Sequence, residues 1–263
     1  MRADAHRDAL VLMLHTLGIS RAALHANPDR IHTPAEQAAY DAAVQRRLRS
    51  EPIQYITGEQ EFYGLALHVT PAVLIPRPET EHLVEAVLAE LNAAAPLQIL
   101  DVGTGSGAIA IALAHYLPQA QITAVDLSPA ALEVAVSNAA RHQLTHRIRF
   151  VASDLLDGLA RGETFDAIVS NPPYVSTDDR DTLDLQVRDY EPASALFAGP
   201  HGLDIYRRLI PQARAALTAN GLLALEIGHG QRDAIADLLS GWKAVRFVND
   251  LQQIPRVAIA RKP

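Results

Sequence analysis

From residue 97 to its end, the chain alternates between short apolar segments of strand type and longer segments with helical periodicity. Such alternation is typical of a mostly parallel sheet with helices on both faces, because each helix carries the chain back to start the next strand. The sequence therefore predicts an α/β fold with a doubly wound, mostly parallel seven-stranded sheet. The candidate strands are residues 97–102, 121–126, 147–152, 166–170, 222–227, 243–249 and 256–260, and the candidate helices are residues 107–117, 129–141 and 203–219.

Two features interrupt this pattern near the C-terminus. Only residues 250–255 separate the last two candidate strands, and a parallel crossover needs about a dozen residues or more, so this pair must run antiparallel if the strands are neighbours. Pro211 lies inside the last candidate helix. Proline removes a hydrogen bond there and clashes with the preceding turn, so we expect that helix to be kinked or split.

Composition narrows the class of protein. A chain of 263 residues with 49% hydrophobic residues can bury one large core or two modest ones. The net charge of −7 disfavours binding that depends on neutralising many phosphates. The chain has no cysteine, which excludes disulfides, thiolate metal sites and cysteine nucleophiles. No apolar run approaches the roughly 18 residues of a membrane span, and the N-terminus does not resemble a presequence. We expect a cytoplasmic protein with no membrane contact.

Residues 1–52 are predicted to form a small all-α N-terminal domain. Four apolar residues between Leu10 and Leu17 recur at i, i+3, i+4 and i+7, as one face of a helix requires. Thr33-Pro34-Ala35-Glu36 is a capping box with proline at the first helical position, which predicts the start of another helix.

Residues 53–75 differ from both neighbouring regions. Gly58 and Gly64 lie among aromatic and apolar residues, which favours a β-hairpin linker. Pro76 and Pro78 then bracket Arg77, and each proline restricts the residue before it to an extended conformation. We expect this stiff segment to begin the larger domain, residues 76–263. The side chains of Arg77 and Glu79 either serve the site or form salt bridges that stiffen this connection.

A glycine-rich loop follows the first strand of the sheet, in the segment Asp101-Val102-Gly103-Thr104-Gly105-Ser106-Gly107. Glycines at this position let the chain turn sharply and let a ligand approach the backbone. The spacing is Gly-x-Gly-x-Gly and not the dinucleotide pattern Gly-x-Gly-x-x-Gly, because residue 108 is alanine. Taken alone, the loop is equally consistent with a tight turn that binds nothing.

Two acidic residues favour a nucleoside ligand. Asp126 ends the second strand, where a carboxylate can accept hydrogen bonds from both ribose hydroxyls. It also precedes the helix start at Ser128-Pro129, so a role at the helix end is the alternative. Asp154 follows the third strand, where it can accept from an adenine amino group. Asp154 or the nearby Asp157 can instead cap the next helix.

The most specific motif is Asn171-Pro172-Pro173-Tyr174, directly after the fourth strand. The carboxyl ends of parallel strands face one crevice, so this loop and the glycine loop should open onto the same site. The prolines remove two backbone donors and hold the loop extended. The loop therefore presents two acceptors, the side-chain carbonyl of Asn171 and the backbone carbonyl of Pro172, together with the flat ring of Tyr174.

Two acceptors of this kind match the two protons of one amino group. An amide or exocyclic amine is a weak nucleophile because its lone pair is delocalised. Accepting both N–H bonds orients the nitrogen and increases the electron density on it. Holding that nitrogen in line with the methyl group of a sulfonium can then lower the activation barrier by about 7–11 kcal/mol. We therefore predict transfer of a methyl group to an –NH2 group.

These motifs resemble those of the HemK/PrmC family, class I methyltransferases that use S-adenosyl-L-methionine. Members modify the glutamine of the Gly-Gly-Gln motif in peptide chain release factors. The resemblance extends from the helical N-terminal part through Pro76–Glu81, Asp101–Gly107 and Asn171–Tyr174 to Tyr190-Glu191-Pro192. It implies a class I methyltransferase domain over residues 76–263, release factors as protein partners that the N-terminal helices contact, and transfer to the side-chain amide nitrogen N5.

The resemblance also assigns residues. It implies that Asn171, Pro172 and Tyr174 are catalytic, and that Pro173 joins them in holding the substrate glutamine. Some members have an aromatic residue at the position of Leu155. The residues implied to bind the cofactor are Gly103, Thr104, Gly105, Ser106, Gly107, Asp126, Asp154, Leu155 and Asn171.

Two other functions compete with this interpretation. An adenine-N6 nucleic-acid methyltransferase uses a similar loop, because adenine also presents an –NH2 group, but it predicts a basic groove and a target-recognition insertion. A nucleotide-binding module without transfer activity predicts the full Gly-x-Gly-x-x-Gly spacing. We expect no bound metal, no direct nucleic-acid contact and a monomer. Glu226, which ends the fifth strand, is a candidate base or a structural acid, and we assign no general base.

Overall fold

The computed structural model describes residues 2–263; Met1, the first residue of the predicted N-terminal domain, lies outside the described residues. Its centre is a seven-stranded sheet with the order β5-β4-β3-β6-β7-β9-β8. The first five strands in this order are parallel, and β9 is antiparallel to both of its neighbours. The strands are β3 (Gln98–Val102), β4 (Gln121–Asp126), β5 (Ile148–Ala152), β6 (Phe165–Ser170), β7 (Leu217–Glu226), β8 (Lys243–Asn249) and β9 (Pro255–Arg261).

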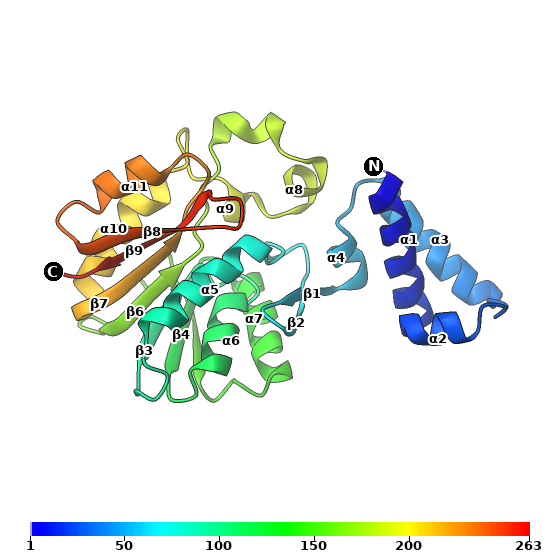
Figure 1. The fold of residues 1–263 in the computed structure, drawn as a ribbon, viewed down its shortest axis with the longest axis horizontal. Helices are drawn as coiled ribbons and strands as arrows, with labels where there is room; N and C mark the ends of the chain where they lie inside the picture. The colour runs from blue at the N-terminus through cyan, green and yellow to red at the C-terminus, as the bar shows by residue number, and fades with distance from the viewer. Residues whose placement is uncertain (1) are drawn as a thin grey trace.

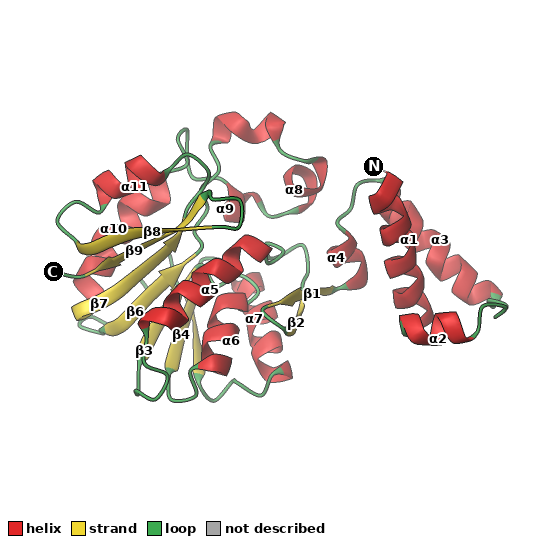
Figure 2. Ribbon diagram, viewed as in Figure 1, coloured by secondary structure: helices red, strands yellow, loops and turns green. Residues whose placement is uncertain are grey.

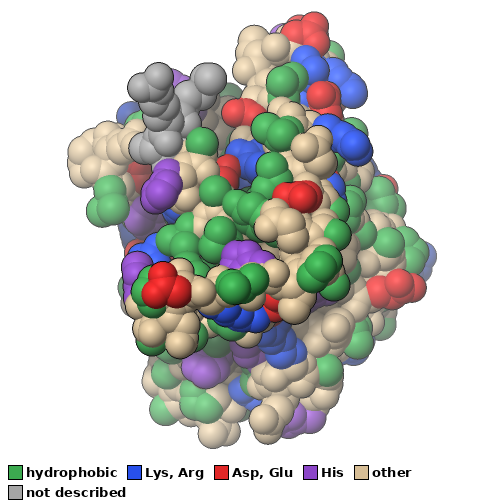
Figure 3. All heavy atoms as spheres, turned by 90° about the vertical axis from the view of Figure 1, so that its right-hand side faces the viewer, with side chains coloured by type: hydrophobic (Ala, Val, Ile, Leu, Met, Phe, Trp, Pro, Cys, Tyr) green, Lys and Arg blue, Asp and Glu red, His purple; other side chains and the backbone are tan. Residues whose placement is uncertain are grey.

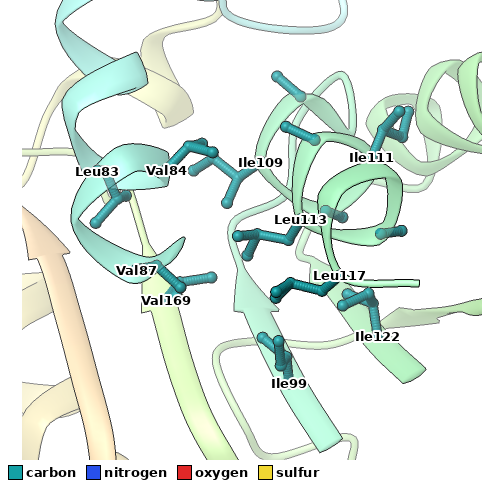
Figure 4. Packing of buried hydrophobic residues seen from close by; sticks show 14 of the residues in the cluster. Leu83, Val84, Val87, Ile99, Ile109, Ile111, Leu113, Leu117, Ile122 and Val169 are labelled. Carbon is teal, nitrogen blue, oxygen red and sulfur yellow. The ribbon is translucent and has the colours of Figure 1, made fainter. Parts of the chain in front are cut away.

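Helices cover both faces of the sheet, as Figures 1 and 2 show. One face is covered by α5 (Pro78–Glu90), α6 (Ala108–Tyr116) and α7 (Pro129–Arg141), and the other by α10 (Asp204–Ala216) and α11 (Arg232–Leu238). Figure 4 shows the first face: Leu83 and Val87 of α5 and Leu113 of α6 meet Ile99 and Val169 of the strands. The predicted doubly wound sheet, with its antiparallel C-terminal strand, is confirmed.

Of the two outcomes expected at Pro211, a kink or a split, the split does not occur, because α10 is one helix from Asp204 to Ala216. Pro211 lies on the exposed side of α10, and the carbonyl of Arg207, which loses its usual partner, belongs to an exposed residue too. Tyr206 and Leu209 before the proline and Ala213 after it are all buried against the sheet. Packing on both sides of Pro211 therefore holds the helix together.

Other boundaries also differ from those predicted. Strand β7 begins at Leu217, five residues before the predicted start, so α10 ends before the predicted residue 219. Within the larger domain, four short helices were not predicted. They are α11 and the three elements that follow the Asn171 loop, namely η1 (Thr177–Thr182), α8 (Leu185–Tyr190) and α9 (Ala193–Leu196).

The N-terminal helices stand apart from the sheet and join it through a short connection (Figure 1). They are α1 (Arg2–Leu17), α2 (Arg21–Ala26) and α3 (Pro34–Leu48), and α3 begins with the predicted Thr33–Glu36 capping box. In the connection, the predicted hairpin is shorter than residues 53–75. It consists of β1 (Glu59–Phe62) and β2 (Leu65–His68), and residues 53–57 form the helix α4 (Ile53–Thr57). Ile56 of α4 packs against Leu12 and Ala43.

Two contacts connect the segment after the Asn171 loop to the beginning of the domain. Arg77, just before α5, forms a salt bridge of 2.5 Å with Glu191, whose side chain is almost fully buried. The neighbouring Tyr190 donates from its hydroxyl to the backbone carbonyl of Arg49, 2.7 Å away, at the end of α3. The α8–α9 segment is therefore held by both the N-terminal helices and the start of α5.

In residues 2–263, no helix combines the length and apolar character that crossing a bilayer requires. Figure 3 shows the end of the molecule that carries the N-terminal helices, where basic and acidic side chains are interspersed.

Candidate active site

The glycine loop and the Asn171 loop begin side by side. Strands β3 and β6 are parallel neighbours, and Val102 is paired with Ser170 at their carboxyl ends. The Ser170 hydroxyl donates to the Val102 carbonyl at 2.7 Å, which fixes the two strand ends together. Both loops line one cleft, as predicted from their places on the sheet. The remaining lining includes Thr80, Asp126, Leu127, Asp154, Leu155, Pro192 and Ser194.

Three glycines give the first loop its shape. Gly103, Gly105 and Gly107 have φ values of 73°, 54° and 82°, in the left-handed region that side chains disfavour. A Cβ on Gly105 would meet no atom within 4 Å, whereas one on Gly107 would lie 3.0 Å from Ile111 and 3.2 Å from Ala135. Gly105 therefore leaves open space at the cleft, while Gly107 allows close packing of α6 on α7.

A buried acidic residue at the end of β3 holds the glycine loop by hydrogen bonds. Asp101 is fully buried and accepts from the Thr104 hydroxyl at 2.7 Å and from the Ala110 backbone N–H at 3.2 Å. Burial raises the pKa of Asp101 to about 7, against the lowering effect of these two hydrogen bonds. The carboxyl thus ties the end of β3 to both the loop and the first turn of α6.

Asp126 also contributes to the loop geometry. Its Oδ2 accepts from the Gly105 backbone N–H at 2.9 Å, and its Oδ1 accepts from the Ser128 N–H at 2.9 Å. Each carboxylate oxygen has two lone pairs, so both oxygens retain a second acceptor position. The next residue, Leu127, is 66% exposed and also lines the cleft, so it places apolar surface beside this carboxylate.

Asp154 and Leu155 lie on the same cleft wall. One oxygen of Asp154 accepts from Arg208 of α10 at 2.7 Å, an exposed contact that was not predicted. Leu155 has a φ of 51°, and its carbonyl accepts from the Ser153 hydroxyl at 2.7 Å. Ser153, Asp154 and Leu155, directly after β5, thus all contribute to the cleft lining.

The side-chain amide of Asn171 is held in one orientation. Its Nδ2 donates to the hydroxyl of Thr80, on α5, at 3.0 Å. The side-chain carbonyl Oδ1 is therefore the end of the amide group that does not bind Thr80. Pro172 is buried, and Asn171, Pro172 and Pro173 line the cleft.

Unlike the other three residues of the motif, Tyr174 does not line the cleft and packs against the hydrophobic core on the α10 face of the sheet. Its ring packs with the residues beneath α10, and its hydroxyl donates to Glu226 Oε1 at 3.3 Å. Burial and the carboxyl of Glu226 raise the pKa of Tyr174 well above its ordinary value. Three residues of the motif therefore line the cleft, while the fourth, Tyr174, lies in the core beneath it.

Two polar residues lie beside this motif: Glu226, which the sequence left open as a candidate base or a structural acid, and Thr80, which the sequence did not single out. Glu226 is 1% exposed, and burial raises its pKa to about 7 although the hydroxyls of Thr80 and Tyr174 lower it. Thr80 has the appearance of an ordinary helix residue, and its contact with Asn171 spans 91 positions. No local spacing could have revealed that pair.

Asn138 is a second buried polar residue that sequence reasoning missed. Its side chain accepts from the His68 N–H at 2.7 Å and donates to the carbonyls of His68 and Ser106, each at 2.9 Å. One amide on α7 thereby joins the hairpin strand β2 to the glycine loop.

Solved structures share this fold. The chain superposes on a T. thermophilus 16S rRNA N2 G1207 methyltransferase in complex with AdoMet and guanosine, with a TM-score of 0.59 and 21% identity, over 78% of this chain and 50% of that one. A methyltransferase from Pyrococcus furiosus gives a TM-score of 0.56 and 17% identity, over 84% of this chain and 97% of that one. The chain therefore shares the fold of these class I methyltransferases.

Sequence comparisons give the family. Residues 2–58 match the PrmC N-terminal domain and residues 80–187 match the methyltransferase small domain. A release factor glutamine methyltransferase of Koribacter versatilis is 48% identical over 97% of this chain and 91% of its own length. One from Moorella thermoacetica is 47% identical over 95% of this chain and 87% of its own length. The chain belongs to the release factor glutamine methyltransferase family, as its motifs predicted, and is an enzyme that uses S-adenosylmethionine.

The residues present fit that cofactor. The cleft combines an open backbone cradle at Gly105, a carboxylate at Asp126 with free acceptor positions, and exposed apolar surface at Leu127. A nucleoside with an attached amino-acid chain needs these three kinds of surface: a close backbone approach, an acceptor for hydroxyls and an apolar wall for the base.

Proposed function

We propose that this enzyme transfers a methyl group from S-adenosyl-L-methionine to the side-chain amide nitrogen of the glutamine in the Gly-Gly-Gln motif of peptide chain release factors. Family membership supports the release factor as substrate. The observation that carries the proposal is that Asn171 and Pro172 line the same cleft as the glycine loop. An acceptor pair for an –NH2 group thus lies beside the cofactor cleft.

We propose cofactor contacts for the residues around the glycine loop. Asp126 would accept from the ribose hydroxyls, while Asp154 and Leu155 would flank the adenine. Asn171 would contact both the cofactor and the substrate glutamine. The loop residues Gly103, Thr104, Gly105, Ser106 and Gly107 would complete the cofactor contacts. Bound S-adenosylmethionine supplies an electrophilic methyl carbon on a cationic sulfur.

The Asn171 loop would hold the acceptor. Asn171 Oδ1 and the Pro172 carbonyl would accept the two N–H bonds of the glutamine carboxamide, which orients its nitrogen and increases the electron density there. Pro173 would hold the loop extended, and Tyr174 would brace it from beneath. Holding the two reactants at the right distance and angle lowers the activation barrier of methyl transfer by about 7–11 kcal/mol. The methylated amide nitrogen loses its proton readily, so no side chain is assigned as general base.

The rest of the chain would serve the protein substrate. We propose residues 1–52 as a helical domain that contacts the release factor, residues 53–75 as the linker and residues 76–263 as the methyltransferase domain. The enzyme would act as a monomer, because one copy of the chain carries the whole cleft. We also propose that it is cytoplasmic and makes no direct contact with nucleic acid.

The direct test is transfer of labelled methyl from S-adenosylmethionine to an unmethylated release factor. The matched control is the same release factor with the glutamine of its Gly-Gly-Gln motif changed to alanine. We expect label on the first protein and none on the second. Equal labelling of both acceptors would refute the proposed acceptor atom.

The same assay separates the alternative function. Family membership does not favour an adenine-N6 nucleic-acid methyltransferase. Duplex DNA added as a competing acceptor should remain unlabelled while the release factor is labelled. Label that accumulates on the DNA would favour the alternative instead.

A further inference from the structure

Beneath the Asn171 loop lies a chain of polar groups that ends in a buried carboxyl. Asn171 Nδ2 donates to the Thr80 hydroxyl at 3.0 Å. Thr80 is 4% exposed and Glu226 is 1% exposed, so neither side chain has free access to water. Tyr174 donates to Glu226 Oε1 at 3.3 Å from the other side.

The direction of these hydrogen bonds follows from counting protons. A threonine hydroxyl has one proton to donate. Because Thr80 accepts from Asn171, its own proton is free to point to Glu226, whose pKa the Thr80 hydroxyl lowers. Glu226 Oε2 is buried and has no hydrogen-bond partner within residues 2–263. It is therefore the open acceptor to which the Thr80 proton can turn.

We propose that Glu226 and Thr80 are positioning residues that set which end of the Asn171 amide faces the substrate. With Glu226 ionised, Thr80 donates to Glu226 and accepts from Asn171 Nδ2, so Asn171 Oδ1 is presented to the cleft. With a proton donor in place of the carboxylate, Thr80 would accept from residue 226 and donate to Asn171. The amide would then turn its Oδ1 toward Thr80 and its NH2 toward the cleft, where it repels the N–H bonds of a carboxamide.

The same carboxyl would also brace the loop. The Tyr174 hydroxyl reaches Glu226 from the fourth residue of the motif, and Tyr206 of α10 donates to the Glu226 backbone carbonyl at 2.7 Å. The other charged groups that act on Glu226 are Glu79 of α5, which raises its pKa, and Arg256 of β9, which lowers it. Glu226 thus lies where helix, loop and sheet meet, and not at the cleft surface.

The inference rests on the proposed function for its kinetic test. Thr80→Val keeps the side-chain shape but removes the hydroxyl, and Thr80→Ser keeps the hydroxyl. We expect Thr80→Val to lower kcat for the release factor at least tenfold with the Kd of S-adenosylhomocysteine within about twofold, and Thr80→Ser to recover most of that loss. Glu226→Gln should lower kcat similarly and abolish the rise of kcat with pH that accompanies ionisation of Glu226. Equal losses in Thr80→Val and Thr80→Ser, or wild-type kcat in Thr80→Val, would overturn the proposal.

A second measurement needs no substrate, so it distinguishes failure of this inference from failure of the proposed function. The side-chain NH2 protons of Asn171 can be followed by NMR in the free enzyme. We expect slow solvent exchange in the wild type and in Thr80→Ser, and exchange at least tenfold faster in Thr80→Val. Unchanged exchange in Thr80→Val would show that Thr80 does not orient the amide, whatever the enzyme methylates.

Discussion

At the scale of single residues, the site depends on buried polar groups whose partners lie far away in the sequence. The position of Asn171 was predictable because its motif follows a strand directly. Thr80 and Asn138 were not predictable, because each is defined by contacts across about 70 to 90 positions. Periodicity reports which face of an element is buried, but it does not report which buried polar groups will meet.

Two buried carboxyls should make stability depend on pH. Asp101 and Glu226 have pKa values of about 7 in the folded enzyme because both are desolvated, and ordinary values near 4 when unfolded. Between these values the folded state binds more protons than the unfolded state, so the free energy of unfolding falls as pH rises from about 4 to about 7. Urea denaturation of the free enzyme should show higher stability at pH 5 than at pH 8.

Matched variants identify the source of that pH effect. Asp101→Asn and Glu226→Gln should each flatten the decline of stability between pH 5 and pH 8, because neither amide titrates. Stability that rises over this range in the wild type, or a slope unchanged in both variants, would contradict the assignment.

The glycine loop gives a second prediction at this scale. Gly105→Ala should cost about 1–2 kcal/mol, from the left-handed backbone alone. Gly107→Ala should cost about 2–5 kcal/mol, because the added Cβ also presses on Ile111 and Ala135. Chemical denaturation of the two variants checks the order. Equal losses would mean that the α6–α7 contact relaxes freely.

At the scale of elements, most of the sheet was predictable from the sequence. Parallel strands buried on both faces are near-continuous apolar runs, so the predicted β4 matches the structure at both ends. The predicted β8 also matches at both ends, although it is an exposed edge strand that pairs antiparallel with β9. The short helices after the Asn171 loop were not predictable, because segments of four to six residues carry too little periodicity. The continuity of α10 across Pro211 depends on tertiary packing, which local propensity does not report.

The salt bridge between Arg77 and Glu191 should stabilise the junction of α5 with the α8–α9 segment. Arg77→Ala would leave the buried Glu191 carboxylate without its partner, so we expect a loss of about 2–4 kcal/mol in the free energy of unfolding at pH 8. The control Arg188→Ala breaks the more exposed pair with Asp189 and should leave the free energy of unfolding nearly unchanged. Similar small losses in both variants, measured by urea denaturation, would contradict a structural role for Arg77.

At the scale of the whole molecule, one hydrogen bond joins the N-terminal helices to the segment that follows the Asn171 loop. The Tyr190 hydroxyl donates to the Arg49 carbonyl at 2.7 Å, and the Tyr190 ring packs against a cluster that includes Tyr55 and Val73. The α9 segment beyond it contributes Ser194 and Ala195 to the cleft. The orientation of the N-terminal domain is thereby coupled to the cleft wall.

Tyr190→Phe tests this coupling, because it keeps the ring and removes only the hydroxyl. We expect KM for a whole release factor to rise about two- to fivefold, the effect of one partly exposed hydrogen bond. KM for a short Gly-Gly-Gln peptide should not change, since the peptide is too small to reach the N-terminal helices. Tyr116→Phe, on the exposed side of α6, is the control. Steady-state kinetics with both substrates would contradict the coupling if the two KM values rose together.

The central claim is that the acceptor is a carboxamide nitrogen held by Asn171 and Pro172. Fragmentation mass spectrometry of the release factor, after reaction with wild-type enzyme or with Asn171→Ala, locates the methyl group directly. We predict one methyl on the glutamine side chain of the Gly-Gly-Gln motif with the wild type and none with Asn171→Ala, although that variant still binds S-adenosylhomocysteine. A methyl group on any other residue, or equal modification by the variant, would contradict the account.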